Sequence, residues 1–194
     1  MAGVRQFDEA AAMEAALALF WRQGLAATSM PDLAGATGVQ RGSLYNAYGD
    51  KEAIFLRAFD LYAERFLAAA RAGLAGETAE AVLSGFFRAA IASMTSGTPP
   101  RGCLTTKTAS DGSVALPRVR ERLKAFLDAL TALVEEALAR PDLRAGLAVA
   151  PDRAARVVVT FTRGLAVMER LDGDRDGLAA LADALVASLV RGPA

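Results

Sequence analysis

The stretch Phe20–Glu52, with the sequence FWRQGLAATSMPDLAGATGVQRGSLYNAYGDKE, decides the fold of this chain. Ser29 is a favourable helix N-cap, because its hydroxyl can accept a hydrogen bond from an otherwise unpaired backbone N–H group, and it predicts a short helix over residues 29–37. Gly38 ends that helix, and residues 40–48 predict a second short helix. Two short helices joined by a glycine turn have the spacing of a helix-turn-helix.

Apolar residues recur at helical spacing in the rest of the chain as well. Met13, Leu17 and Phe20, for example, share one face of a helix that Gly24 ends. The β-branched segment 156–162 keeps the same period, so we expect it to be helical too. The pattern therefore predicts an all-α chain of about nine helices. Besides the two short helices, we expect helices over residues 8–23, 50–71, 77–94, 103–110, 117–140, 152–171 and 178–190, with residues 142–150 unassigned.

Composition indicates a folded protein with a core of its own. Hydrophobic residues make up 53% of the 194-residue chain and charged residues 23%, which argues against a disordered chain. No apolar run approaches the roughly 18 residues of a membrane-spanning helix, so we expect no membrane partner. The first residues, Met1–Asp8, lack the apolar stretch of a signal peptide, so we expect a cytoplasmic protein.

The chain contains no histidine and a single cysteine, Cys103. One cysteine cannot form an intrachain disulfide, and structural zinc sites need several cysteine or histidine ligands, so we expect no metal. Ser-His-Asp and Cys-His catalysis both need histidine, and the sequence has no glycine-rich phosphate loop. We therefore expect neither an enzyme nor a bound cofactor.

Net charge gives no support for nucleic-acid binding. The chain has 22 basic and 22 acidic residues. Residues 1–57 contain five basic and six acidic residues, which is a net charge of −1. Since phosphate neutralisation dominates the affinity of proteins for nucleic acids, a DNA-binding function would have to rest on a few well-placed groups.

The second short helix, residues 40–48, presents such groups. Arg41 can donate two hydrogen bonds to a guanine edge in the major groove. Gln40, Ser43 and Asn46 can reach bases or phosphates from the same helix.

Other residues nearby suit the approach to a DNA backbone. Gly42 has no side chain that would hold the helix away from the groove. The hydroxyls of Thr28, Tyr45 and Tyr48 suit phosphate oxygens, and Lys51 adds positive charge at the start of the next helix. From the pattern alone, two ordinary surface helices with a solvated polar face would explain these residues equally well.

A series of motifs favours the DNA-binding interpretation. The motifs are Phe20-Trp21-Arg22-Gln23-Gly24, Ala27-Thr28-Ser29-Met30, Asp32-Leu33-Ala34, Thr37-Gly38-Val39, Arg41-Gly42-Ser43-Leu44-Tyr45 and Tyr48-Gly49-Asp50-Lys51-Glu52. In order and spacing they closely resemble the DNA-binding domain of the TetR (tetracycline-repressor) family, over about residues 7–60. The chain departs from many members at Asn46-Ala47, where they have histidine or an aromatic residue.

The resemblance implies an all-α homodimer with a variable effector domain. It implies that Arg41, Ser43, Tyr45 and Asn46 lie near bases or backbone, and that Thr28, Tyr48 and Lys51 lie at phosphates. With the two residues that the helix pattern adds, the predicted DNA-binding set is Thr28, Gln40, Arg41, Gly42, Ser43, Tyr45, Asn46, Tyr48 and Lys51.

The predicted organisation is a three-helix helix-turn-helix DNA-binding domain over residues 1–52 and a helical effector-binding and dimerisation bundle over residues 53–194. We expect a ligand-responsive repressor that binds a double-stranded DNA operator and is released from it by a small apolar or electrophilic effector. The alternative is a helical small-molecule-binding or scaffold protein without DNA binding. Such a protein should have lost Lys51, Tyr45 or Gly38, and this chain keeps all three.

A second resemblance concerns Cys103. The segment Arg101–Ala109 resembles the Gly-Cys-Leu segment of a TetR subgroup that includes reactive-electrophile sensors, with the usual acidic residue displaced to Asp111. Cys103 is either a buried apolar filler or a thiolate sensor, which its place at a helix start and Lys107 one turn later would favour. Aromatic residues at helical spacing lie more often in a core than in a pocket, but an effector cavity must be lined from them. The expected effector-pocket residues are Phe59, Tyr62, Phe66, Phe87, Cys103, Thr106, Phe126 and Phe161.

The last two predicted helices, residues 152–171 and 178–190, carry adjacent apolar stripes with few central charges. We expect them to form the interface of a homodimer, because helix-turn-helix proteins read paired half-sites. The alternative is that both stripes belong to the intramolecular core.

Overall fold

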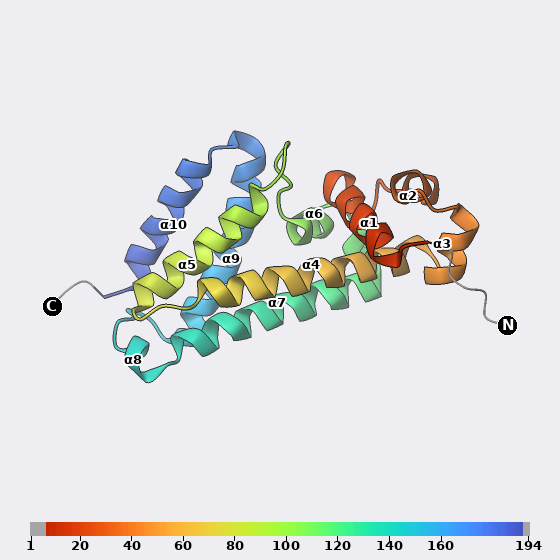
Figure 1. Cartoon of the computed structure of the whole chain (residues 1–194). Helices are drawn as coiled ribbons and strands as arrows, with labels where there is room; N and C mark the ends of the chain where they lie inside the picture. Colours follow the sequence, from red (N-terminus) through yellow and green to blue (C-terminus); the bar gives the residue numbers. More distant parts are fainter. Residues whose placement is uncertain (1–6, 192–194) are drawn as a thin grey trace. The chain divides into compact units, whose positions relative to one another are not determined.

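The computed structural model describes residues 7–191. Residues 1–6, on which the expectation about a signal peptide largely rests, lie outside the described part. The helices in chain order are α1 (Glu9–Gln23), α2 (Met30–Thr37), α3 (Arg41–Tyr48), α4 (Lys51–Gly73), α5 (Ala79–Met94), α6 (Leu104–Ser110), the 3₁₀ turn η1 (Ser113–Ala115), α7 (Pro117–Leu138), α8 (Pro141–Arg144), α9 (Pro151–Asp172) and α10 (Arg175–Leu189) (Figure 1). The predicted all-α fold is therefore confirmed.

Most helix bounds differ from the predicted ones by one or two residues, and a 3₁₀ turn, η1, was not predicted; two further differences have a clear local cause. Residues 141–144, at the edge of the unassigned segment, form the short helix α8, which opens with a proline at its first turn. The described residues thus hold ten α-helices where about nine were expected. The last helix starts three residues earlier than predicted, at Arg175, because the Asp174 carboxylate accepts a hydrogen bond from the N–H of Asp176 at 3.1 Å and caps it.

The chain divides into two compact units that are not continuous segments. The first unit comprises the residues up to Glu64 together with Lys107–Leu123, and the second comprises Arg65–Thr106 and the residues from Lys124 onward. Helices α4, α6 and α7 contribute residues to both units. The predicted boundary between residues 52 and 53 separates a DNA-binding segment from an effector-binding segment. The two compact units do not test that functional boundary, so it stays a prediction.

In the first unit, α1, α2, α3 and the start of α4 share one apolar core. Phe20, Leu33, Leu44 and Phe55 are fully buried there, one from each helix. The rings of Phe20 and Phe55 meet edge to face at 5.2 Å between centroids. Burying a Leu or Phe side chain contributes roughly 1.5–3 kcal/mol, so a few such contacts hold the two short helices in place.

In the second unit, α5 packs against α9 and α10, and the later part of α4 lies beside α7. The rings of Phe66 on α4 and Phe126 on α7 meet at 5.9 Å between centroids. The end of α4 approaches α5 backbone to backbone, since a Cβ at Gly73 would lie 2.6 Å from the carbonyl oxygen of Gly85. Among residues 7–191, no helix combines the length and the apolar character that crossing a bilayer requires.

Candidate nucleic-acid interface

Helix α2 begins with a complete capping box. The Ser29 hydroxyl oxygen accepts a hydrogen bond from the N–H of Asp32 at 3.2 Å, and the Asp32 carboxylate accepts one from the N–H of Ser29 at 2.8 Å. The Ser29 hydroxyl also donates to the Asp32 carboxylate at 2.6 Å, and this hydrogen bond, followed by the one from the Ser29 N–H, lowers the pKa of Asp32 below its ordinary value. Gly38 ends α2 in the left-handed conformation, with φ of 67°.

Helix α3 follows Gly38 and has the opposite character. Within residues 7–191, the Gln40 side chain at its N-cap makes no capping hydrogen bond. Only Leu44 and Tyr48 of this helix are buried. The residues that face solvent are six of the predicted DNA-binding set: Gln40, Arg41, Gly42, Ser43, Tyr45 and Asn46.

Two features of this exposed face bear on what it can contact. The side chain of Tyr45 is 62% exposed, although an aromatic ring normally seeks burial. A Cβ added at Gly42 would meet no atom of the described chain within 4 Å, so the backbone there is open to an approaching surface. The face therefore offers hydrogen-bonding side chains on a helix whose other side is anchored in the core.

The structure places the remaining three predicted DNA-binding residues inside the first unit. Thr28 is 2% exposed, and its hydroxyl donates to the carbonyl oxygen of Gly24 at 2.5 Å. Tyr48 is 8% exposed, and the guanidinium of Arg57 lies over its ring at 5.4 Å. Lys51 is half-buried, and its Nζ donates to the carbonyl oxygen of Leu25 at 2.9 Å. Their phosphate contacts stay predictions. In this structure all three side chains make contacts within the first unit that stabilise its fold.

The connection between α1 and α2 is held by charged side chains from distant parts of the sequence. Lys107 donates to the carbonyl oxygens of Trp21 at 2.7 Å and Arg22 at 2.5 Å. The carboxylate of Asp111 accepts from the N–H of Ala26 at 3.2 Å. Sequence reasoning missed this role for Lys107 and Asp111, because nothing in the local pattern links residues about 85 positions apart.

The predicted effector-pocket residues fall into both units. In the first unit, Phe59 and Tyr62 pack with ring centroids 5.5 Å apart, and the rings of Tyr62 and Trp21 pack edge to face with centroids 5.2 Å apart. In the second unit, Phe87 and Phe161 form an edge-to-face pair at 5.9 Å. The second unit also holds Phe66, Cys103, Thr106 and Phe126.

Cys103 lies directly before α6 and is 6% exposed. Nη1 of Arg163 on α9 lies 3.4 Å from its sulfur, in hydrogen-bonding geometry, and a guanidinium beside a sulfur favours the thiolate. The hydroxyl of Thr105 is buried, and no hydrogen-bond partner for it lies among the described residues. Sequence reasoning did not single out Thr105, because a threonine on a helix gives no signal that its hydroxyl is buried.

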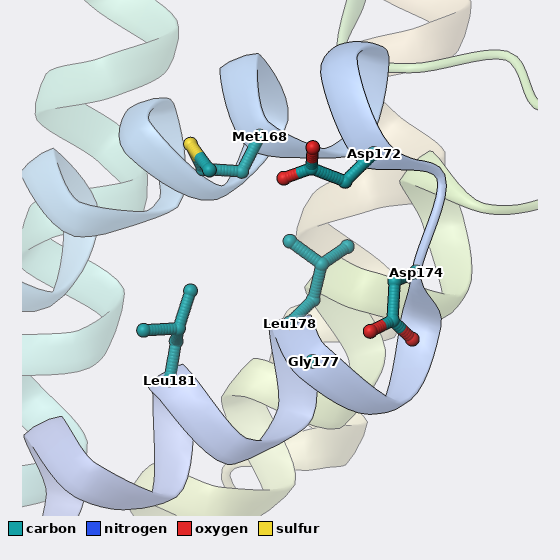
Figure 2. Close-up of a pocket in the computed structure, with 6 residues that line it drawn as sticks. All are labelled: Met168, Asp172, Asp174, Gly177, Leu178 and Leu181. Atoms are coloured by element: carbon teal, nitrogen blue, oxygen red, sulfur yellow. The ribbon is translucent and has the colours of Figure 1, made fainter.

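The outer faces of α9 and α10 carry exposed apolar side chains. Leu171 is 72% exposed, and Val167 and Leu181 are close to half exposed. Between the two helices lies an open pocket of about 280 Å³. Figure 2 shows the residues that line it, with the side chains of Met168 and Leu181 at its apolar end: Met168, Asp172, Asp174, Gly177, Leu178 and Leu181.

Comparison with known proteins places these features in one family. The family model of the bacterial regulatory proteins, tetR family, matches residues 12–58. The model of the tetracyclin repressor-like C-terminal domain matches residues 79–185.

Individual proteins agree with the family models. The HTH-type transcriptional repressor ComR of Escherichia coli (strain K12) is 37% identical over 116 residues, which cover 56% of this chain and 55% of that protein. The alignment thus spans about half the length of this curated relative.

The whole fold has solved counterparts. The TetR family transcriptional regulator CifR, solved as a cysteine mutant complexed with 26-bp double-strand operator DNA, superposes with a TM-score of 0.85 at 28% identity, covering 96% of this chain and 99% of that one. The reduced form of NemR from E. coli has a TM-score of 0.81 at 17% identity, covering 95% and 98%, which shows the shared fold. The two family models and these structures together cover the helix-turn-helix and the helical bundle, and the chain belongs to the TetR family of bacterial transcriptional regulators.

Proposed function

We propose that this regulator is a repressor that binds a DNA operator as a homodimer and leaves it when a small effector binds. The observation that carries the proposal is the exposed polar face of α3, which Leu44 and Tyr48 anchor from behind. An α-helix of this kind fits the major groove, where each base pair presents a distinct set of donors and acceptors.

Arg41 is the residue for which we propose base recognition. It lies in the first turn of α3 and is exposed, so its guanidinium is available to a guanine edge. We assign backbone contacts to Tyr45 and Ser43, whose exposed hydroxyls suit phosphate oxygens. The buried positions of Thr28 and Tyr48 favour a supporting role, in which they hold the segments that carry the exposed residues.

The dimer interface that we propose is the outer face of α9 and α10. Contiguous exposed apolar side chains on a protein surface commonly mark an interaction site. Here Val157, Val167 and Leu171 on α9 and Leu181 on α10 are all exposed. A two-fold pairing of this face would present two α3 helices to two half-sites of the operator.

The effector site that we propose lies in the second unit, beside Cys103. Aromatic pairs such as Phe87 and Phe161 provide an apolar surface, and the unpartnered Thr105 hydroxyl suits a ligand with a hydrogen-bond acceptor. Burial of Cys103 favours its role as an apolar filler, whereas the Arg163 contact favours thiolate chemistry. A reversible apolar ligand and an electrophile are therefore separate candidates. If the thiol is the sensor, iodoacetamide should release wild type but not Cys103→Ser from DNA.

The test of the main proposal is selection of bound sequences from a random double-stranded DNA library, followed by fluorescence anisotropy on the selected site. We expect wild type to bind that site far more tightly than random DNA. Arg41→Ala should weaken specific binding by about 1–3 kcal/mol and leave binding to random DNA nearly unchanged. Arg144→Ala, which removes an exposed arginine of α8, is the matched control and should leave both affinities unchanged.

Two results would contradict the proposal. Equal losses on specific and random DNA would show that Arg41 does not read bases. A wild type that enriches no sequence would favour the alternative, a helical small-molecule-binding protein without DNA binding.

A further inference from the structure

We infer that Lys107 and Asp111, which lie far from the helix-turn-helix in the sequence, are positioning residues for DNA binding. They hold the connection between α1 and α2, and through it they set where α2 and α3 lie against α1. The inference rests on the proposed function, because operator affinity is the property that these residues would control.

The two side chains carry opposite charges and bind neighbouring stretches of backbone, Lys107 the last turn of α1 and Asp111 the connection that follows it. Lys107 Nζ donates to the carbonyl oxygens of Trp21 and Arg22, at 2.7 and 2.5 Å. Four residues later, Asp111 Oδ2 accepts from the N–H of Ala26 at 3.2 Å, while its Oδ1 accepts from the N–H of Ser113 at 2.9 Å. We call Lys107, on α6, and Asp111, the first residue after α6, the α6 clamp.

The clamp acts where the α1 backbone most needs partners. No N–H group of a helix donates to its last carbonyl oxygens, and the helix dipole places partial negative charge on them. An ammonium group that donates to two of these oxygens supplies the missing hydrogen bonds and places positive charge at the negative end of the dipole. Because α1 ends at Gln23, the two oxygens that Lys107 contacts belong to its last turn.

Gly24 leaves space for the clamp. A Cβ at this position would lie 2.8 Å from Asp111 Oδ2 and 3.5 Å from Lys107 Cδ. Gly24 also adopts φ of 82°, which favours glycine. A side chain at position 24 would therefore collide with Asp111, and glycine leaves room for it.

The clamped segment leads directly to the first helix of the DNA-binding motif. Only two residues separate Ala26 from Ser29, the N-cap of α2, and Gly38 follows α2 on the way to α3. A shift of the α1–α2 connection is therefore passed on to α3. Small displacements of a group far from the bases reduce specific binding, since base contacts require close alignment with the groove.

Removing each charge in turn separates positioning from simple electrostatic attraction to DNA. If Lys107 and Asp111 acted through their charges on the phosphates, removing the cation would weaken binding and removing the anion would strengthen it. Positioning predicts that both changes weaken operator binding. Lys107→Ala and Asp111→Ala should each reduce operator affinity about tenfold.

Conservative variants at the two clamp positions and alanine variants of a second Lys–Asp pair serve as controls. Lys107→Arg keeps a cationic donor and Asp111→Asn keeps an acceptor oxygen, so each should restore much of the lost affinity. Lys124 and Asp128 on α7 form an exposed ion pair at 2.6 Å with the same four-residue spacing. Lys124→Ala and Asp128→Ala should leave operator affinity unchanged.

The fluorescence of Trp21 reports on the structure around the clamp without any DNA. Trp21 is its single tryptophan, and its carbonyl oxygen is one of the two that Lys107 contacts. Its ring also packs edge to face with that of Tyr62, with 5.2 Å between the ring centroids. Lys107→Ala and Asp111→Ala should change the emission spectrum of Trp21, whereas the two α7 control variants should not.

The outcomes distinguish failure of the inference from failure of the proposed function. If wild type binds no operator, the proposed function fails. If wild type binds but the clamp variants behave as the α7 controls do, or if Asp111→Ala tightens binding, the inference is wrong. Variants that lose affinity are scored only when thermal unfolding shows them to be folded at the temperature of the binding measurement.

Discussion

Helices α2 and α3 are neighbours of equal length, eight residues each, yet they are built in opposite ways. The start of α2 is closed by the Ser29–Asp32 capping box, so its first N–H groups are partly satisfied within the protein. The start of α3 has Gln40 at the N-cap without a capping bond in the described residues, and no acidic residue in its first turn. Both helices bury a leucine fully, Leu33 in α2 and Leu44 in α3.

The difference at the two helix starts suggests a division between a helix that is stabilised within the protein and a helix whose start is available to a ligand. A capped helix keeps its own end stable without help from a ligand. An uncapped helix start leaves N–H groups and the positive end of its dipole available, which suits a negatively charged partner. The buried leucines show that both helices are fixed by packing, so the difference at their N-termini is not a difference in how well they are anchored.

The largest expected effect tests that shared anchoring. Leu33→Ala and Leu44→Ala should each reduce the free energy of unfolding by about 2–5 kcal/mol, because each removes a fully buried side chain and leaves a cavity. Urea denaturation followed by circular dichroism measures the loss. Leu116→Ala, at a leucine that is 38% exposed, is the control with the smaller expected loss. A much smaller loss for Leu44 than for Leu33 would mean that α3 is loosely held, and the comparison would fail.

An intermediate effect tests the caps. Ser29→Ala should reduce the free energy of unfolding by about 0.5–2 kcal/mol, because the N–H of Asp32 loses its acceptor. Gln40→Ala should change it by less than about 0.5 kcal/mol, because no capping bond is lost within the described structure. Thermal unfolding of both variants provides the measurement. Equal losses at the two positions would remove the distinction between a closed and an open helix start.

The smallest expected effect is a dependence on pH that only α2 should show. The hydrogen bonds from Ser29 lower the pKa of Asp32, so its carboxylate stabilises the folded state at pH values above the ordinary aspartate pKa of about 3.9. That contribution is lost as the pH falls through the lowered pKa of the folded state. Asp32→Asn should flatten this part of the stability profile, measured by urea denaturation between about pH 2 and pH 6. An unchanged profile would show that the capping box does not depend on charge.

Helix positions could be predicted from the sequence because each helix buries residues at its own regular spacing. Met13, Leu17 and Phe20 gave α1, and the two short helices followed from Ser29 and Gly38. The exposure of Tyr45 on α3 was predictable for the same reason, since it directly follows the buried Leu44 and so lies on a different face of the helix. The β-branched segment 156–162 was correctly assigned to a helix, which is α9.

What the sequence did not reveal depends on contacts between distant residues. A threonine hydroxyl suits a phosphate and a backbone carbonyl equally well, so the burial of Thr28 against Gly24 could not be foreseen. Lys107 was interpreted through its neighbour in the sequence, Cys103, whereas its Nζ donates to the carbonyl oxygens of Trp21 and Arg22, about 85 residues away. The grouping of Phe59 and Tyr62 with Trp21 in the first unit likewise depends on the fold.

The crossing of Gly73 and Gly85 has a consequence for the genetics of this protein. Each glycine faces the backbone of the other helix, where even a methyl group would overlap the opposing carbonyl group. Every missense change of one nucleotide in a glycine codon introduces a residue with a Cβ atom. Neither position therefore tolerates any single-nucleotide missense change, although both residues lie outside the helix-turn-helix. In a library of random point mutants, loss of the folded protein should arise at these two positions from every amino-acid replacement, whereas Gly35 on α2, where an added Cβ would meet no atom of the described chain within 4 Å, should accept alanine.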